Sequence, residues 1–203
     1  VHAKSITLLA KSIRPLPIVK EKEGKTFDAF KDKDQRYRNR HLDLIVNPEI
    51  KDVFQSRAKI TSALRKYLDD EGFLEVETPV LQPLYGGANA RPFKTHHNTL
   101  DQTFYLRIAD ELYLKRLIIG GIDKVYELSK DFRNEGMDRN HNPEFTMLEW
   151  YEAYSDYEDQ MDRVENIIRL AGEAVGKTKI KWANSDIDLT KAFDKKPFLD
   201  LFK

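Results

Sequence analysis

Residues 132–151 of this chain read FRNEGMDRNHNPEFTMLEWY. The polar middle of this stretch separates two segments, Lys124–Phe132 and Phe145–Tyr151, in which apolar and polar residues alternate. Alternation with a period of two residues is typical of β-strands, and a polar loop between two such strands predicts an antiparallel hairpin. Helical patterns before and after the hairpin indicate an α+β fold, in which helices flank an antiparallel sheet.

One face of the predicted hairpin carries most of its charged residues, because successive side chains of a strand point to opposite faces. On one face of the second strand lie Phe145, Met147, Glu149 and Tyr151. The matching face of the first strand, continued into the loop, holds Glu127, Ser129, Asp131, Arg133 and Glu135. A half-buried sheet with such a polar floor could bind a charged ligand, and a solvated sheet face is the alternative.

The loop of the hairpin gathers side chains that could meet a nucleotide, namely Arg133, Glu135, Arg139 and His141. An arginine fork fits a phosphate, and a carboxylate can accept a hydrogen bond from the amino group of a base. Spacing alone leaves two interpretations open, an ATP site and an ordinary polar turn.

The segment before the hairpin begins with a helical pattern. Apolar residues recur at helical spacing from Pro48 to Leu68, and Gly72 is placed to end this helix. Residues 73–78 then alternate as a strand, which Pro79 closes.

Two further helices are predicted on either side of the hairpin. A short strand over residues 104–108 leads into a helix that ends before Gly120. After the hairpin, Ser155 to Glu158 form a capping-box pattern, which predicts the start of a long helix.

The first 47 residues are expected to form a separate part of the chain. Residues 1–13 alternate loosely, as a strand does, and prolines end that pattern at positions 15 and 17. A lone strand cannot pair its edges, so we expect residues 1–17 to belong to a larger barrel or sheet. The charged segment 18–47 is predicted to be a linker, and residues 48–203 the main domain.

Composition excludes several classes of protein. The 203 residues include 34 Lys+Arg and 34 Asp+Glu, so there is no basic excess to indicate a dedicated nucleic-acid module. The absence of cysteine removes disulfides and thiolate metal sites, and it fits a reducing, cytoplasmic compartment. Apolar runs stay well below the roughly 20 residues that span a bilayer, so no membrane association is expected.

The hairpin closely resembles motif 2 of class II aminoacyl-tRNA synthetases, in the wording of their lysyl branch (subclass IIb). The resemblance rests on FRNEG at 132–136 and HNPEFTMLEWY at 141–151. GFLEVETP at 72–79 is similar to the end of motif 1, and GGANARPF at 86–93 and ELYLKR at 111–116 also match the lysyl branch. The family's fold is α+β, with an antiparallel sheet flanked by helices.

The resemblance also implies a domain organisation. Motif 1 would cover about residues 50–79 and motif 2 about residues 124–154 of a catalytic domain that begins near residue 48. Residues 1–17 would be the last strand of an N-terminal OB-type anticodon-binding barrel, followed by the linker at 18–47.

By the same resemblance, five residues would form the ATP site. Arg133 would be catalytic, because it would bridge the substrate carboxylate and the α-phosphate and stabilise the charge on the pentacoordinate phosphorus. Glu135 would accept from the adenine amino group, and Phe145 would stack on the adenine ring, with a core aromatic as its alternative. His141 and Asn142 would lie near the phosphates and the nucleoside.

Four residues would form the lysine site. Because lysine carries a cation at each end, its pocket needs two separate carboxylates, for which Glu149, with Tyr151 beside it, and Glu111 are the candidates. Gly87 would let the backbone approach the substrate. A helix-capping carboxylate is the alternative for Glu111, and an ordinary turn is the alternative for Gly87.

The implied activity is that of a lysine-tRNA ligase acting in translation. ATP and L-lysine would give lysyl-adenylate, and the lysyl group would pass to tRNA(Lys), in a cytoplasmic homodimer formed through motif 1. Motif 3 and the carboxylates that hold Mg²⁺ are expected beyond Lys203, so no metal site is expected within the chain and this stretch alone should be inactive.

Two other functions are compatible with the same motifs. One is a synthetase paralogue that modifies a translation elongation factor, although the segment from Arg36 to Ile45 favours the tRNA enzyme. The other is a truncated, non-catalytic synthetase-like module.

Overall fold

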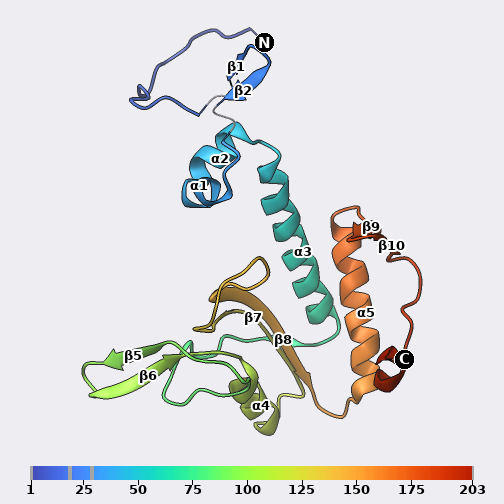
Figure 1. The fold of residues 1–203 in the computed structure, drawn as a ribbon. Helices are drawn as coiled ribbons and strands as arrows, with labels where there is room; N and C mark the ends of the chain where they lie inside the picture. Colours follow the sequence, from blue (N-terminus) through green and yellow to red (C-terminus); the bar gives the residue numbers. More distant parts are fainter. Residues whose placement is uncertain (1, 18–19, 28–29, 203) are drawn as a thin grey trace. The chain divides into compact units, whose positions relative to one another are not determined.

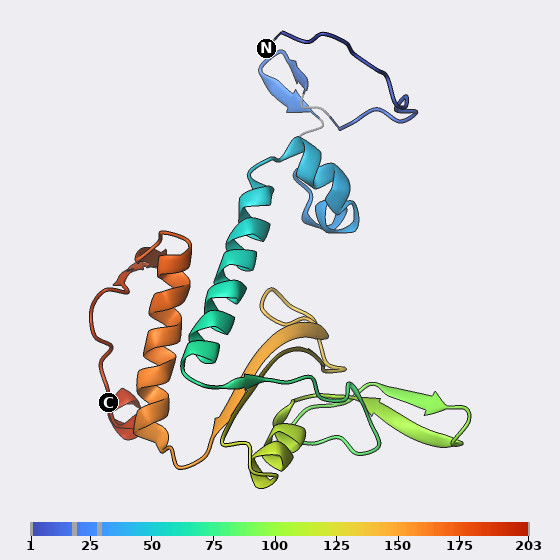
Figure 2. The ribbon, with the colours of Figure 1, turned by 180° about the vertical axis from the view of Figure 1, so that it is seen from behind.

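The computed structural model describes residues 2–17, 20–27 and 30–202 (Figures 1 and 2). The chain divides into two units, Val1–Lys59 and Ile60–Lys203, which are described separately here. Helix α3 (Ile50–Asp70) crosses the boundary between them.

The first unit contains a short hairpin and two short helices. Strands β1 (Lys20–Lys22) and β2 (Lys25–Phe27) pair antiparallel. Helix α1 (Lys33–Arg38) begins at Asp32, whose side chain accepts a hydrogen bond from the Gln35 amide, and α2 (Arg40–Val46) follows it. The segment predicted as a linker therefore contains regular structure where it is described.

The strand predicted within residues 1–13 is not formed. Residues 2–17 have no regular secondary structure, and Leu8 and Leu9 are exposed. Among the described residues no neighbouring strand offers this segment backbone hydrogen bonds, without which an extended strand is not stable. The assignment of residues 1–17 to a barrel, and the domain boundaries at 17 and 47, stay predictions; residues 1, 18–19 and 28–29 lie outside the described part.

The predicted long helix is confirmed as α3. It ends where expected, because Gly72 takes φ +83° and Phe73 donates its amide to the Leu68 carbonyl at 2.9 Å. Leu68 and Phe73 then pack against Tyr126, and these three buried residues form the apolar side of the hairpin sheet.

The predicted hairpin is confirmed as the centre of the main sheet. Strands β7 (Lys124–Phe132) and β8 (Glu144–Glu152) pair antiparallel along their whole length. Strand β3 (Leu74–Glu75) adds to β7 in parallel and is shorter than the strand predicted over 73–78. It is shorter because Thr78 bonds the carboxylate of Glu127 through its amide and hydroxyl, instead of continuing the backbone ladder.

A second, smaller sheet leads into helix α4. Strands β4 (Leu81–Gln82), β6 (Gln102–Leu106) and β5 (Lys94–His97) pair in that order, and the β5–β6 hairpin extends away from the main sheet in both views (Figures 1 and 2). The strand predicted over 104–108 is thus two residues earlier. Helix α4 (Glu111–Ile119) ends at Gly120 as predicted.

The last part of the chain starts with the predicted long helix, α5 (Tyr157–Ala174). Its capping box uses Asp156 and Asp159, one position later than predicted, because the Asp156 side chain accepts from two backbone amides of the first turn. A hairpin of β9 (Lys179–Trp182) and β10 (Ser185–Asp188) follows, and then the 3-10 helix η1 (Phe198–Phe202).

Among the described residues, no helix is both long enough and apolar enough to cross a bilayer.

Candidate functional site

The polar face of the hairpin lies where the sequence predicts it. Glu127 pairs with Glu149 and Asp131 with Phe145, so these side chains point to one side of the sheet. This face is covered, because Glu127 and Asp131 are buried and α4 lies against it (Figure 1). The alternative of a solvated sheet face is therefore wrong for this part of the sheet.

A cavity of about 540 Å³ opens beside the end of the hairpin, and it is lined by Arg133, Glu135, Gly136, Met137, Asp138, Asn140, His141, Asn142 and Phe145. The five residues predicted for the ATP site are all among them. The carbon at the centre of the Arg133 guanidinium lies 5.1 Å from the centre of the Phe145 ring, and Phe145 is half-buried. A flat ring at the wall of a cavity, next to a cation, can stack a planar base.

Arg133 is fixed by the backbone on both sides of it. Its amide donates to the carbonyl of Pro143 at 2.9 Å, and its Nε donates to the carbonyl of Ile108 at 3.3 Å. A guanidinium has five N–H donors, so holding Nε orients the group while leaving donors for a ligand in the cavity.

Glu135 ties the hairpin loop to a segment from earlier in the chain. Its Oε1 accepts from the amide of Arg91 at 3.2 Å, and the amide of Asn134 donates to the Arg91 carbonyl at 2.7 Å. The resemblance did not assign a site role to Arg91, although its backbone helps to position Glu135. A contact between residues 44 positions apart leaves no signal in local spacing.

Asp138 is a second residue that the sequence reasoning did not assign. Its Oδ1 accepts from the amides of Asn140 and His141, and its Oδ2 lies 2.7 Å from Nδ1 of His141. The hydrogen bond from the Asn140 amide, helped by the one from His141, lowers the pKa of the Asp138 carboxyl below its usual range. An aspartate that accepts a hydrogen bond from the amide two residues later forms an Asx turn. The aspartate in this polar loop is therefore the sequence signal for the turn.

The predicted lysine-side residues meet around the start of α4. Gly87 has φ +86°, and a Cβ added there would lie 2.8 Å from Cβ of Glu111. An ordinary turn, the alternative for Gly87, does not require so close an approach to another side chain. Glu111 accepts from Nζ of Lys115 at 2.6 Å; no side-chain cap bond is present at this helix start among the described residues.

Both carboxylate oxygens of Glu149 accept a hydrogen bond. Its Oε1 accepts from the amide of Asp110 at 3.3 Å, and its Oε2 accepts from the hydroxyl of Tyr151 at 3.4 Å. Burial is the main reason that the pKa of Glu149 is raised above its usual value. A carboxylate that loses water on burial gains from an incoming cation, which restores its charged form.

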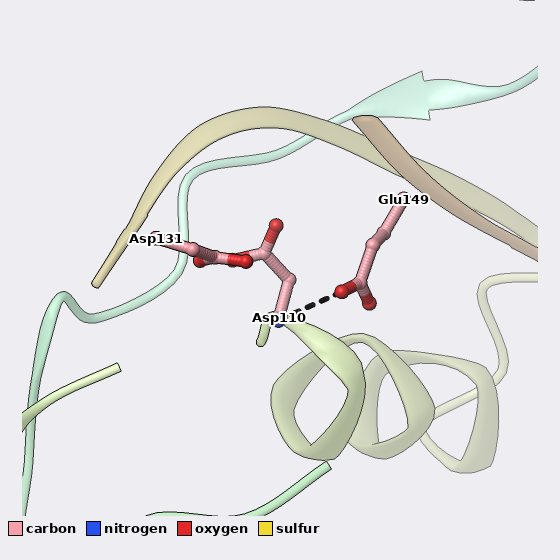
Figure 3. Close-up of side chains that lie close together, drawn as sticks. All are labelled: Asp110, Asp131 and Glu149. Atoms are coloured by element: carbon pink, nitrogen blue, oxygen red, sulfur yellow. Dashed lines mark hydrogen bonds between the residues drawn. The ribbon is translucent and has the colours of Figure 1, made fainter. Parts of the chain in front are cut away.

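The described residues contain one acidic group close enough to hold a metal ion, Asp110, Asp131 and Glu149, whose oxygens lie within 4.8 Å of one another (Figure 3). This group lies on the covered sheet face, and the lining of the Arg133 cavity holds no such group within the described chain. The cavity lining therefore does not fit a magnesium site on its own, and the expectation that the Mg²⁺ ligands lie beyond Lys203 stays a prediction.

Comparison with known proteins decides the family. Residues 32–203 match the family described as tRNA synthetases class II (D, K and N). The chain belongs to this family. This class II synthetase chain thus has the α+β fold that its motifs predicted, and the assignment of motif 2 to the β7–β8 hairpin stays a prediction.

The chain is also similar to two named relatives. The chain is 54% identical over 189 residues to a lysine--tRNA ligase of Porphyromonas gingivalis, which covers 93% of the chain and 33% of that protein. It is 53% identical over 204 residues to a lysine--tRNA ligase of Pelotomaculum thermopropionicum, covering 100% of the chain and 39% of that protein. The chain therefore spans about a third to two fifths of the length of these class II synthetases.

Proposed function

We propose that this chain is part of a lysine-tRNA ligase, which activates L-lysine with ATP and transfers the lysyl group to tRNA(Lys). The observation that carries the proposal is the presence of two carboxylates around the start of α4: Glu111, against which the backbone of Gly87 lies, and Glu149, which accepts from the amide of Asp110. Lysine presents a cation at each end, and the identity to lysine--tRNA ligases over the whole chain supports the same substrate.

In the proposed activation step, a carboxylate oxygen of lysine attacks the α-phosphorus of ATP. The new bond joins that oxygen to phosphorus, and the bond to the bridging oxygen of the β-phosphate breaks, so pyrophosphate leaves. Arg133 stabilises the charge that builds up on the phosphoryl oxygens, without any covalent bond to the protein. Phe145 stacks the adenine, Glu135 accepts from its amino group, and His141 and Asn142 lie near the nucleoside and phosphates.

Substrate selection would rest on two carboxylates at separate places. Glu111, with Gly87 against it, takes one cationic end of lysine, and Glu149 with Tyr151 takes the other. Lys115 forms an ion pair with Glu111 on α4, and the substrate would compete with Lys115 for this carboxylate. An exposed helix pair of this kind contributes only about 0.3–0.5 kcal/mol, so a bound ligand can displace it.

The remaining partners follow from the same proposal. Mg²⁺ would neutralise the ATP phosphates when bound, tRNA(Lys) would accept the lysyl group, and cytoplasmic translation would consume the product. A homodimer through motif 1 would use α3, on which Val53 and Phe54 expose apolar side chains.

The test is lysine-dependent ATP–pyrophosphate exchange and charging of tRNA(Lys) by the complete protein. Replacing Arg133 by Ala should lower exchange by about 100-fold or more, as the loss of a charge-stabilising donor does. Arg116→Ala, which removes an arginine from the surface of α4, is the control and should leave exchange unchanged.

Three results would contradict the proposal. Near-normal exchange by Arg133→Ala would overturn the role of Arg133. Lysine transfer to an elongation factor with no charging of tRNA would favour the paralogue, and no exchange by the complete protein would favour a non-catalytic module.

A further inference from the structure

A single arginine faces three buried carboxylates beneath the proposed lysine site. The NH1 nitrogen of Arg107 lies 2.7 Å from Oε1 of Glu127 and 3.1 Å from Oδ1 of Asp110, and its Nε lies 3.4 Å from Oδ1 of Asp131. These four side chains are at most 6% exposed. With all three acids ionised, this buried group would carry a net charge of about −2 before Glu149 is added, which is costly away from water.

The three carboxylates differ in how many hydrogen bonds they receive. Glu127 accepts from Arg107 and from both the amide and the hydroxyl of Thr78. Asp110 accepts from the hydroxyl of Ser129 at 2.6 Å on one oxygen. The other oxygen of Asp110 and both oxygens of Asp131 make no hydrogen bond within the described chain, although both residues are fully buried; Arg107 meets Oδ1 of each only as an ion pair.

The carboxylates of Asp110 and Asp131 lie close to each other and to that of Glu149 (Figure 3). The carboxylates of Asp110, Asp131 and Glu149 each offer an oxygen within 4.8 Å of the other two. Like charges this close in a buried place do not all ionise, so the group holds either a proton or a cation.

A metal ion fits this place poorly. Oxygen ligands lie about 2.0–2.6 Å from Mg²⁺ or Ca²⁺. Arg107 already faces the same oxygens of Asp110 and Asp131 from 3.1 and 3.4 Å, so a divalent ion there would lie next to a fixed positive charge. A substrate ammonium does not reach the two aspartates either, because both are 0% exposed.

We propose that Asp110 and Asp131 share one proton, and that this pair positions the carboxylates of the lysine site. A proton on Asp131 lets its hydroxyl donate to Asp110, which supplies the missing donor and leaves one negative charge on the pair. The part of this inference that concerns lysine rests on the proposed function.

Asp110 connects the pair to both proposed lysine-binding carboxylates. Its amide holds Oε1 of Glu149, and it is the residue from which α4 starts, immediately before Glu111. A second charge on the pair would repel Glu149 and shift this segment, which disturbs both carboxylates at once. The aspartates are therefore positioning residues and do not touch the substrate.

The environment of Asp131 agrees with a proton held near neutral pH. Burial, followed by the charge of Asp110, raises the pKa of Asp131 to about 7, although Arg107 and Arg133 oppose the shift and Glu149 adds to it. Burial also raises the pKa of Asp110. Because the pKa is 3.8 for an ordinary aspartate, the native protein holds the proton more tightly than the unfolded chain, and this contribution to stability is lost as pH rises from 3.8 to about 7.

The key variant is Asp131→Asn, which keeps a donor toward Asp110 and cannot lose a proton. In the complete protein, the KM for lysine in ATP–pyrophosphate exchange should rise several-fold from about pH 6 to about pH 9, with kcat changed less. In Asp131→Asn the KM should stay near its low value throughout. Glu149 is present in both proteins, so a pH dependence of KM that came from Glu149 alone would also appear in Asp131→Asn.

Thermal unfolding gives a readout that does not depend on the proposed function. Asp131→Asn should raise the melting temperature relative to the unsubstituted protein, and the difference should grow as pH rises from about 4 to about 7 and then stay level. Asp123→Asn, at an exposed aspartate, is the control and should give a small difference that does not change with pH.

The outcomes separate the two proposals. If exchange is absent but the pH-dependent melting difference remains, the shared proton stands and the lysine-tRNA ligase proposal fails. If the melting difference does not change with pH, or if Mg²⁺ or Ca²⁺ stabilises the unsubstituted protein but not Asp131→Asn, the shared proton is overturned. If melting behaves as expected but both proteins show the same pH profile of KM, the positioning role is overturned.

Discussion

At Gly87 the backbone lies against Glu111 of the proposed lysine site. Its φ of +86° is unfavourable for any other residue, and an added Cβ would lie 2.8 Å from Cβ of Glu111 and 3.2 Å from that of Ala109. We expect Gly87→Ala to raise the KM for lysine at least about tenfold, because it displaces Glu111, and 1.4 kcal/mol of lost binding already equals that factor.

Gly121→Ala is the matched control for this substitution. Gly121 has φ +95° but no atom within 4 Å of an added Cβ, so its replacement adds the same kind of backbone strain without a clash. Both variants should lose some thermal stability, and only Gly87→Ala should change the KM for lysine. Equal KM values in the two variants would show that Gly87 serves the turn and not the site.

At the scale of single residues, the sequence predicted side-chain directions better than contacts. Period-two spacing on the strand placed Glu149 and Tyr151 on one face, and the register with β7 confirms it. The pairing of Asp110 with Asp131 was not predicted, because it depends on how the segment after β6 crosses the sheet. Arg107 joins that segment to the sheet through the carbonyl of Lys130, a contact between residues 23 positions apart that leaves no signal in local spacing.

At the scale of elements, an ion-pair network connects the hairpin to α5. Glu152, on the last position of β8, lies 2.8 Å from Nζ of Lys124 and 2.7 Å from NH2 of Arg163. Burial alone would raise the pKa of Glu152, but the hydrogen bonds from Lys124 and Arg163 outweigh it and lower that pKa below 4.5. The ionised form is therefore favoured in the native protein.

We expect Glu152→Gln to lower the free energy of unfolding by about 1–3 kcal/mol at pH 7, as the loss of hydrogen bonds to a charged group that is mostly shielded from water does. A lowered pKa means that the contribution is present above the ordinary value of 4.5 and is lost as pH falls below it. The melting temperatures of the two proteins should therefore differ at pH 7 and converge in acid.

The control on the same strand is Glu144→Gln. Glu144 is 58% exposed and lies 3.8 Å from Lys130, a surface pair that contributes little. A difference between Glu152→Gln and the unsubstituted protein that persists unchanged below pH 4.5 would mean that lost packing, and not lost charge, explains it.

The elements that were predicted well are those whose signal is local. Helix α3 and the β7–β8 hairpin carry their own periodicity and their own stop signals, such as Gly72. Strand β3 was predicted too long, because the side chain of Glu127 competes for Thr78, a contact between residues 49 positions apart. The strand expected near the N-terminus is not formed for a related reason, since a strand depends on partner strands that its own sequence does not contain.

At the scale of the whole molecule, the two carboxylates should make binding depend on both cationic ends of lysine. A ligand that binds the native protein alone raises the free energy of unfolding by about 2.7 kcal/mol at 100 times its Kd. Norleucine lacks the side-chain ammonium and 6-aminohexanoate lacks the α-ammonium, so each loses one charged hydrogen bond, worth about 1.5–3 kcal/mol. At equal concentration, lysine should therefore raise the melting temperature of the complete protein clearly more than either analogue.

Substituting each carboxylate then assigns the ends of the substrate. Glu111→Gln and Glu149→Gln should both weaken the binding of lysine about ten- to a hundredfold, with a smaller effect on the binding of ATP. One variant should bind lysine and norleucine about equally, and the other should bind lysine and 6-aminohexanoate about equally, because each has lost its contact to one end. If either variant weakened the binding of ATP more than the binding of lysine, its carboxylate would belong to the ATP site. If both kept full discrimination against both analogues, two separate carboxylates would not explain the selection of lysine.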